Sequence, residues 1–252
     1  MLTLSTSRAT AVIDPELGGR ITSLTIDGTE VLVTGTSADN AMAWGCYPMV
    51  PWAGRVRRGR FRFDGLGHHL PVNLEPHAIH GTGFTARWQL LPDDSMLHRF
   101  PADWPFGGHA LQRFEIDETG LMCRMEVHAD RHPMPAMAGW HPWFRRPVSL
   151  SFSAEQMYQR DDDGIPDGAL VAPPPPPWDD CFVGVRVPPQ LSWPDGPTVT
   201  VTSNCDHWVV YDEPAHAICV EPQSGPPDEF NLRRHVVQPG TPLTTWMRLS
   251  WA

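Results

Sequence analysis

Apolar side chains recur at every second position along several short segments of this chain, and that spacing is the strongest constraint on its fold. In the C-terminal segment the residues expected on one face are Leu243, Thr245, Met247, Leu249 and Trp251. Because successive side chains of a β-strand point to opposite faces of a sheet, this period predicts a strand with one buried face. By contrast, no stretch of helical length carries apolar residues at the 3.6-residue spacing of a half-buried helix.

Glycine and proline divide the chain into many such segments. The chain holds 21 glycines and 28 prolines. Turn sequences at 27–28 (Asp-Gly), 64–65 (Asp-Gly) and 117–120 (Asp-Glu-Thr-Gly) predict hairpins, since these residue types tolerate the positive φ of tight turns. The hairpin arms would be 21–26 with 31–33, 61–63 with the residues after 65, and 114–116 with 121–127. Further strands are predicted at 148–152, 199–202, 208–211 and 217–220.

Many short strands between tight turns predict an all-β protein with a β-sandwich or barrel-like architecture. Residues 173–177 are all proline, which cannot join a sheet ladder, so this stretch predicts a stiff extended crossing within one domain. At 252 residues and 41% hydrophobic, the chain is compatible with one large all-β domain over 1–252.

Charge and cysteine content limit the partners. The formal net charge of −10 argues against a nucleic-acid binder, and a neutral small molecule fits better. The longest uncharged apolar stretch, 41–54, contains prolines and falls short of the ~20 residues that span a bilayer, so we expect no membrane association. The N-terminus has no export-signal pattern, and the cysteines form no CxxC pair. We therefore expect a cytoplasmic protein with reduced thiols.

Two short motifs place a titratable side chain beside a proline, which we expect to form a turn: His141-Pro142-Trp143-Phe144 and Glu221-Pro222-Gln223. Imidazole and carboxylate are the groups most often used to move protons near neutral pH, so the pair indicates acid/base chemistry. A His80-Gly81 turn and Arg55, in Pro51-Trp52-Ala53-Gly54-Arg55, add polar groups that could bind a sugar.

In their order along the chain, these motifs resemble those of the aldose 1-epimerase (galactose mutarotase) family. The resemblance covers most of the chain. It rests on Gly18-Gly19-Arg20-Ile21, the segment 48–61, His80-Gly81, His141-Pro142-Trp143-Phe144, Ile165-Pro166-Asp167-Gly168, Asp179-Asp180-Cys181-Phe182, Glu221-Pro222-Gln223 and 227–231. It implies a large many-stranded antiparallel β-sandwich of the galactose mutarotase type, a supersandwich.

The resemblance also implies roles. Glu221 would be the general base and His141 the general acid, while His80, Arg55 and Asp180 would bind sugar hydroxyls. In such a reaction the base takes the proton of the C1 hydroxyl and the acid protonates the ring oxygen, so the ring opens to an aldehyde and closes on its other face. Base and acid would lie on opposite sides of the hemiacetal. The chemistry needs neither a metal nor an organic cofactor.

Simpler explanations exist for the same residues. Glu221 could be a solvated strand end, and His141 could be a core histidine bonded to backbone. The choice of Asp180 over Asp179 depends on the alignment with the following Cys181-Phe182. Tryptophans can hold the apolar face of a pyranose, and those beside the motifs, Trp52, Trp143 and Trp178, are candidates, or else they are core residues. Of the three, Trp143 is the one we assign to the sugar.

Metal sites are conceivable but weakly signalled. His77 and His80 lie three residues apart without a third ligand at a recognised spacing. Asp161-Asp162-Asp163-Gly164 lacks the alternating oxygen ligands of a calcium loop and predicts a turn instead.

Two rival functions stay open. Arg57, Arg58 and Arg60 could bind phosphate, which would suit a hexose-6-phosphate 1-epimerase, although an exposed arginine-rich strand face explains them too. A non-catalytic carbohydrate-binding protein could share the same sandwich. The expected partner is in every case a small-molecule sugar, and the chain is expected to be a monomer or homodimer.

Overall fold

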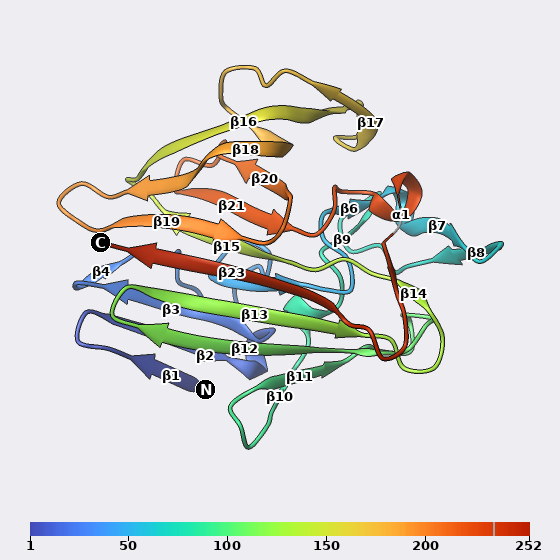
Figure 1. The fold of residues 1–252 in the computed structure, drawn as a ribbon, viewed down its shortest axis with the longest axis horizontal. Helices are drawn as coiled ribbons and strands as arrows, with labels where there is room; N and C mark the ends of the chain where they lie inside the picture. The colour runs from blue at the N-terminus through green and yellow to red at the C-terminus, as the bar shows by residue number, and fades with distance from the viewer. Residues whose placement is uncertain (234) are drawn as a thin grey trace.

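The computed structural model describes residues 1–233 and 235–252, and seventeen of the strands belong to one sheet system. In the first half of this system, neighbouring strands are β10 (Gln89–Leu90), β11 (Met96–Arg99), β12 (His109–Asp117), β13 (Gly120–His128), β23 (Leu243–Trp251) and β19 (Thr198–Ser203). In Figure 1, β12, β13 and β23 run side by side. All of these pairs are antiparallel.

The second half carries the strands that matter for function. Its order is β18 (Asp179–Ser192), β20 (His207–Tyr211), β21 (Ala217–Gln223), β15 (Gly139–Arg145), β5 (Cys46–Met49), β3 (Arg20–Ile26), β2 (Ala9–Asp14) and β1 (Leu2–Ser5). The long strand β18 joins the two halves, because its start pairs with β20 and its end pairs with β19.

Shorter elements complete the fold. β4 (Thr29–Glu30) pairs with β3, and β16 (Ser149–Arg160) lies between β17 (Pro166–Val171) and β18. The two-stranded sheets are β14 (Met134–Pro135) with β22 (Val236–Val237), β6 (Arg55–Val56) with β9 (Ala78–Ile79), and β7 (Arg60–Phe63) with β8 (Leu66–His69). The helical elements are α1 (Glu229–Leu232) and the 3₁₀ turns Pro15–Leu17, Arg57–Gly59 and Gly83–Thr85. The β7–β8 hairpin projects from one end of the molecule (Figure 1).

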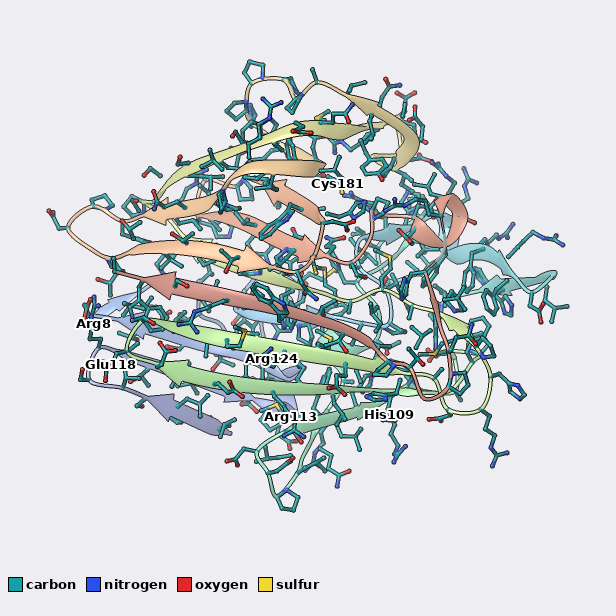
Figure 2. The ribbon with its side chains drawn as sticks, viewed as in Figure 1. Arg8, His109, Arg113, Glu118, Arg124 and Cys181 are labelled. Atoms are coloured by element: carbon teal, nitrogen blue, oxygen red, sulfur yellow. The ribbon has the colours of Figure 1, made fainter. Side chains whose placement is uncertain are left out.

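The period-two pattern has the predicted physical cause in the outer strands. Along β23, Thr245, Met247, Leu249 and Trp251 are buried while the residues between them are partly exposed. On β12 and β13 the charged Arg113 and Arg124 are exposed, and Figure 2 shows them on the outside of these strands. Their neighbours face the core, which confirms the antiparallel all-β prediction.

Most predicted turns are also confirmed. Asp27 and Gly28 have φ of 48° and 82°, and Asp64 and Gly65 have φ of 48° and 77°. The hairpin partner of β3, however, is β4 and not the predicted segment 31–33. Val31 still bonds to β3, since its amide donates to the carbonyl of Leu24, but the prediction was wrong for 32–33, because Leu32 pairs with Phe144 and the amide of Val33 donates to the carbonyl of Trp143.

The proline stretch 173–177 lies between β17 and β18, outside any strand, as expected. In the part of the chain that the structure describes, no helix is long and apolar enough to cross a membrane.

Candidate active site

A cavity of about 440 Å³ opens on the second half of the sheet system. Its walls include residues of β5, β15, β18, β20 and β21, which are neighbouring strands. One face of β15 and β21 packs against the core and the other lines the cavity, and the residues of both strands are almost all buried. This double burial removes the alternating pattern from the sequence of these strands.

Strand register brings the key side chains to one face. β5 pairs with β15 so that Tyr47 lies opposite His141. β15 pairs with β21 at Gly139–Gln223 and Trp143–Cys219, which places Glu221 level with His141. Residues that are 80 apart in sequence therefore become neighbours on adjacent strands.

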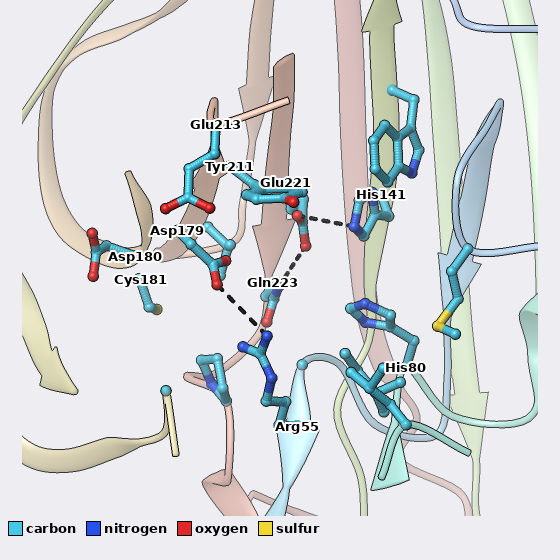
Figure 3. A pocket seen from close by; sticks show the side chains of 18 of the residues that line it. Arg55, His80, His141, Asp179, Asp180, Cys181, Tyr211, Glu213, Glu221 and Gln223 are labelled. Carbon is cyan, nitrogen blue, oxygen red and sulfur yellow. Dashed lines mark hydrogen bonds and ion pairs between the residues drawn. The ribbon is translucent and has the colours of Figure 1, made fainter. Parts of the chain in front are cut away.

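Glu221 and His141 are in direct contact. The His141 Nε2 lies 3.1 Å from Glu221 Oε1, and the two side chains are only 6% and 3% exposed, in that order. The amide of Gln223 donates to the other carboxylate oxygen, Oε2, at 3.1 Å. Figure 3 shows both contacts. The simpler reading of Glu221 as a solvated strand end is therefore excluded.

The expectation that these motifs form proline turns was wrong, since both lie within strands. The β15–β21 ladder has no paired residues between Gly139–Gln223 and Trp143–Cys219. Pro142 and Pro222 fall in this interval, where the missing N–H of proline costs no ladder hydrogen bond. The acid and base candidates are consequently adjacent on one sheet face and do not oppose each other across a cleft.

Burial shapes the protonation of this pair. It raises the pKa of Glu221 well above its usual value, and the nearby carboxylate of Asp179 adds to the effect. It lowers the pKa of the His141 imidazole. A low-dielectric site disfavours both charged forms, so the pair holds one proton between its two members over a wide pH range.

This shared proton predicts a broad pH optimum. The acid limb of kcat/KM reports gain of a second proton by the pair and should lie below the 6.5 of an ordinary histidine, because the pKa of His141 is lowered. The alkaline limb reports loss of the shared proton and should lie well above the 4.5 of an ordinary glutamate. Initial rates measured from pH 4 to pH 10 test this. An acid limb at or above 6.5 would contradict it.

Arginines and aspartates form a charged cluster in the cavity lining near the pair. Arg55 lies 3.6 Å from Asp179, and Arg160 bonds to Asp179 at 3.1 Å and to Asp180 at 2.8 Å. Both aspartates line the cavity. Side chains alternate along β18, so Asp179 and Cys181 point to the same face of the sheet. Cys181 is paired with Val209 on β20, and Val209 is paired with Glu221 on β21. Asp179 therefore lies on the same face as Glu221. In Figure 3, Asp179 points toward Arg55.

His80 lines the cavity beside His141. Their rings meet edge to face with centroids 5.1 Å apart, and burial lowers the pKa of His80 well below its usual value. Its position depends on Gly81, because a Cβ there would lie 2.0 Å from the carbonyl oxygen of Val50. The predicted His-Gly turn is confirmed, with φ of 60° and 76°. The neutral His80 ring offers one donor and one acceptor nitrogen.

Of the three tryptophans considered, Trp143 is in the described lining of the cavity, and Trp52 and Trp178 are not. Trp143 lies nearly parallel to His141, with ring centroids 5.3 Å apart. Trp52 stacks on Trp104 in the core, and Trp178 packs against the ring of Phe182.

Arg57, from the arginine cluster, is engaged outside the described cavity lining. Arg57 forms ion pairs with Asp161 and Asp163, which lie on the predicted turn 161–164. That turn is confirmed, because Asp161 Oδ1 accepts from the amides of Asp163 and Ile165. Within residues 1–233 and 235–252 there is no group of three His, Cys, Asp or Glu side chains placed to hold a metal.

Several lining residues were missed by the sequence reasoning. Gln223 belongs to a motif that was already singled out, so its position two residues after Glu221 was a usable signal. Tyr47, Arg160 and Tyr211 carried no comparable signal, because only strand pairing brings them to the cavity, and Glu213 lies in the loop after β20.

Fold and site together define a class, namely a large antiparallel β-sandwich whose sheet face holds a buried carboxylate–imidazole pair in a cavity. The chain belongs to the aldose 1-epimerase family, whose family model matches residues 1–250.

Individual relatives agree with this placement. The uncharacterized protein YphB of Escherichia coli K12 is 31% identical over 136 residues, a match that spans 50% of this chain and 46% of that protein. Among solved structures, an E. coli K12 protein named as a candidate aldose 1-epimerase aligns with a TM-score of 0.86 at 22% identity, covering 99% of this chain and 98% of the other. Galactose 1-epimerase of Lactobacillus acidophilus NCFM gives a TM-score of 0.84 at 17% identity, covering 99% and 93%. At these identities the structures show a shared fold.

Proposed function

We propose that this chain is an aldose 1-epimerase that interconverts the α and β anomers of a free hexose or a related aldose. The observation that carries the proposal is the buried contact between Glu221 and His141 at the wall of a cavity. A hemiacetal carbon bears two oxygens, the C1 hydroxyl and the ring oxygen. Because the carboxylate and the imidazole touch, two oxygens on one carbon can reach both groups at once.

The chemistry follows from the shared proton. Glu221 accepts the proton of the C1 hydroxyl while His141 gives its proton to the ring oxygen, and the C1–O5 bond opens to the aldehyde. After rotation about C1–C2, the reverse transfers close the ring on the other face. Each positioned proton transfer contributes roughly 10²- to 10⁴-fold to a rate. The scheme calls on no metal or organic cofactor.

Sugar binding is assigned to the other polar and aromatic residues of the cavity lining. His80 and Arg55 would donate to hydroxyl groups, Asp180 and its neighbour Asp179 would accept from them, and Trp143 would pack against the ring. The cavity of about 440 Å³ is large enough for one hexose.

Polarimetry of freshly dissolved α-anomers tests the proposal directly. We expect the protein to accelerate the approach to the anomeric equilibrium for at least one of glucose, galactose, xylose or arabinose. A protein that binds a sugar tightly yet leaves the rate unchanged would favour the non-catalytic carbohydrate-binding alternative instead.

Charge in the cavity disfavours the hexose-6-phosphate alternative. Among the described lining residues, four carry a carboxyl group (Asp179, Asp180, Glu213, Glu221) and two carry a guanidinium (Arg55, Arg160). Both guanidinium groups already face carboxylates, as does Arg57. We therefore expect lower kcat/KM for glucose 6-phosphate than for glucose. The reverse order, abolished in Arg57→Ala, would support the phosphate alternative.

The two aspartates can be separated by paired variants. Because Asp179 lies on the face of Glu221, we expect Asp179→Asn to raise KM about 10-fold or more, in line with loss of a charge-assisted hydrogen bond. Asp180 alternates to the other face of β18, so Asp180→Asn should change KM less. Steady-state kinetics of both variants decides, and a larger effect in Asp180→Asn would make Asp180 the main sugar contact.

A further inference from the structure

Gln223 contacts the proposed base but takes no part in the proton transfers above. Its side chain is fully buried, and its Nε2 donates to Glu221 Oε2 at 3.1 Å. Its Oε1 is buried without a hydrogen-bond partner in the described part of the chain, and the residue lines the cavity. The amide therefore has a hydrogen-bonded nitrogen and a buried oxygen without a partner beside the cavity, and such an unsatisfied buried group needs an explanation.

The orientation of this amide follows from its neighbour. In the structure the NH₂ end of Gln223 faces Glu221 Oε2, which is the orientation that favours an ionised carboxylate, since that group only accepts hydrogen bonds. The carbonyl end is then the one without a partner. Figure 3 shows Gln223 beside Glu221, to which a dashed line joins it.

The backbone around Gln223 holds it in place. Gly139 is its register partner on β15, and a Cβ at Gly139 would lie 2.5 Å from the carbonyl oxygen of Pro222 and 3.2 Å from Gln223 Cγ. The next residue, Ser224, bonds to Ala138 through both its amide and its hydroxyl, at 2.9 and 3.0 Å. A residue fixed this firmly can orient a neighbour.

We infer that Gln223 is a positioning residue for Glu221: its amide N–H orients the carboxylate and stabilises the ionised form that accepts the proton, while its amide oxygen accepts a hydrogen bond from the bound sugar. The inference rests on the proposed function for its kinetic consequences. Its electrostatic consequence for Glu221 does not depend on catalysis.

The hydrogen bond opposes the effect of burial on Glu221. A donor to the charged form favours that form, so its removal should raise the pKa of Glu221 further. The fraction of Glu221 in the ionised, proton-accepting state then falls tenfold for each unit by which its pKa rises. The alkaline limb of the pH profile moves upward by the same number of pH units. A merely structural role would lower the rate without moving that limb.

Gln223→Met tests this, since methionine is similar in length and has no N–H donor. We expect kcat/KM at neutral pH to fall about 10- to 100-fold, the range for a hydrogen bond to a charged group, with the alkaline limb about 1 to 2 pH units higher. KM should rise as well, because the acceptor for the sugar is lost. Gln156→Met, at an exposed glutamine of β16, is the matched control and should match the parent.

A second measurement tests the role of Gln223 independently of the proposed epimerase activity. Carboxyl ¹³C NMR of glutamate-labelled protein, with the Glu221 signal identified by its loss in Glu221→Gln, follows the ionisation of Glu221 directly. An upward shift of its midpoint in Gln223→Met supports the inference even if the parent shows no epimerase activity. An unchanged midpoint overturns it. If Gln223→Met folds poorly, as judged by circular dichroism, Gln223→Leu replaces it.

Discussion

Replacing Glu221 by glutamine should reduce kcat/KM for anomer interconversion by about 10² to 10⁴, the range for loss of a general base. Glutamine has nearly the same shape and can still bond to His141 and Gln223, but it cannot accept the proton of the C1 hydroxyl. The fold should survive. Glu221 is buried and its pKa is raised, so a neutral amide removes the cost of burying a charge.

Polarimetry, together with exchange NMR between the two anomers at equilibrium, measures this effect. Glu115→Gln is the matched control, because Glu115 is exposed on β12, a strand with no residue in the described cavity lining. The control should keep the parent rate. If Glu221→Gln retained more than half of the parent kcat/KM with sugar bound normally, Glu221 would not be the base.

Replacing Arg20 by methionine should destabilise the protein by about 3 to 5 kcal/mol, which is at the upper end for a single substitution. Arg20 is 1% exposed, and its guanidinium donates to the carbonyls of Leu17, Trp44 and Phe84 at 2.7, 3.0 and 2.9 Å. It also lies 4.3 Å from the centroid of the Trp44 ring. Burial lowers the pKa of Arg20 to about 10, so it stays charged at neutral pH.

The loss would come mainly from the buried carbonyls of Trp44 and Phe84 left without this donor, each costing about 1 to 3 kcal/mol, with a smaller share from the partly buried carbonyl of Leu17. Equilibrium unfolding in urea, monitored by tryptophan fluorescence, measures it. Arg87→Met is the matched control. Arg87 is 76% exposed and pairs with Glu16, so its loss should cost less than about 1 kcal/mol. A loss below about 1 kcal/mol in Arg20→Met would show that the carbonyls find other partners.

The role of Arg20 changes the meaning of its motif. Gly18-Gly19-Arg20-Ile21 contributed to the family resemblance, yet in the structure Arg20 bonds only to backbone among the described residues. It also lies 5.2 Å from the ring of Tyr47, which stacks on His141. Arg20 therefore packs against Tyr47, a residue of the cavity lining, and is not itself in the described lining.

The local sequence determined the fold class, many of the strands and most of the turns. Alternation over 243–251 and the Asp-Gly pairs at 27–28 and 64–65 act within a few residues, so they can be recognised without knowledge of distant contacts. The order of the motifs was sufficient to indicate the family. The residue types at 141 and 221 were sufficient to indicate acid/base chemistry.

Only the tertiary structure decided how these residues meet. β15 and β21 are buried on both faces, so their sequences lose the alternating pattern and the prolines suggested turns. The register of neighbouring strands placed Glu221 in contact with His141 and put Asp179 on the same face of the sheet. Arg57 forms ion pairs with Asp161 and Asp163. Such contacts join residues far apart in the chain. Their geometry depends on the whole sheet and is not encoded in any one segment.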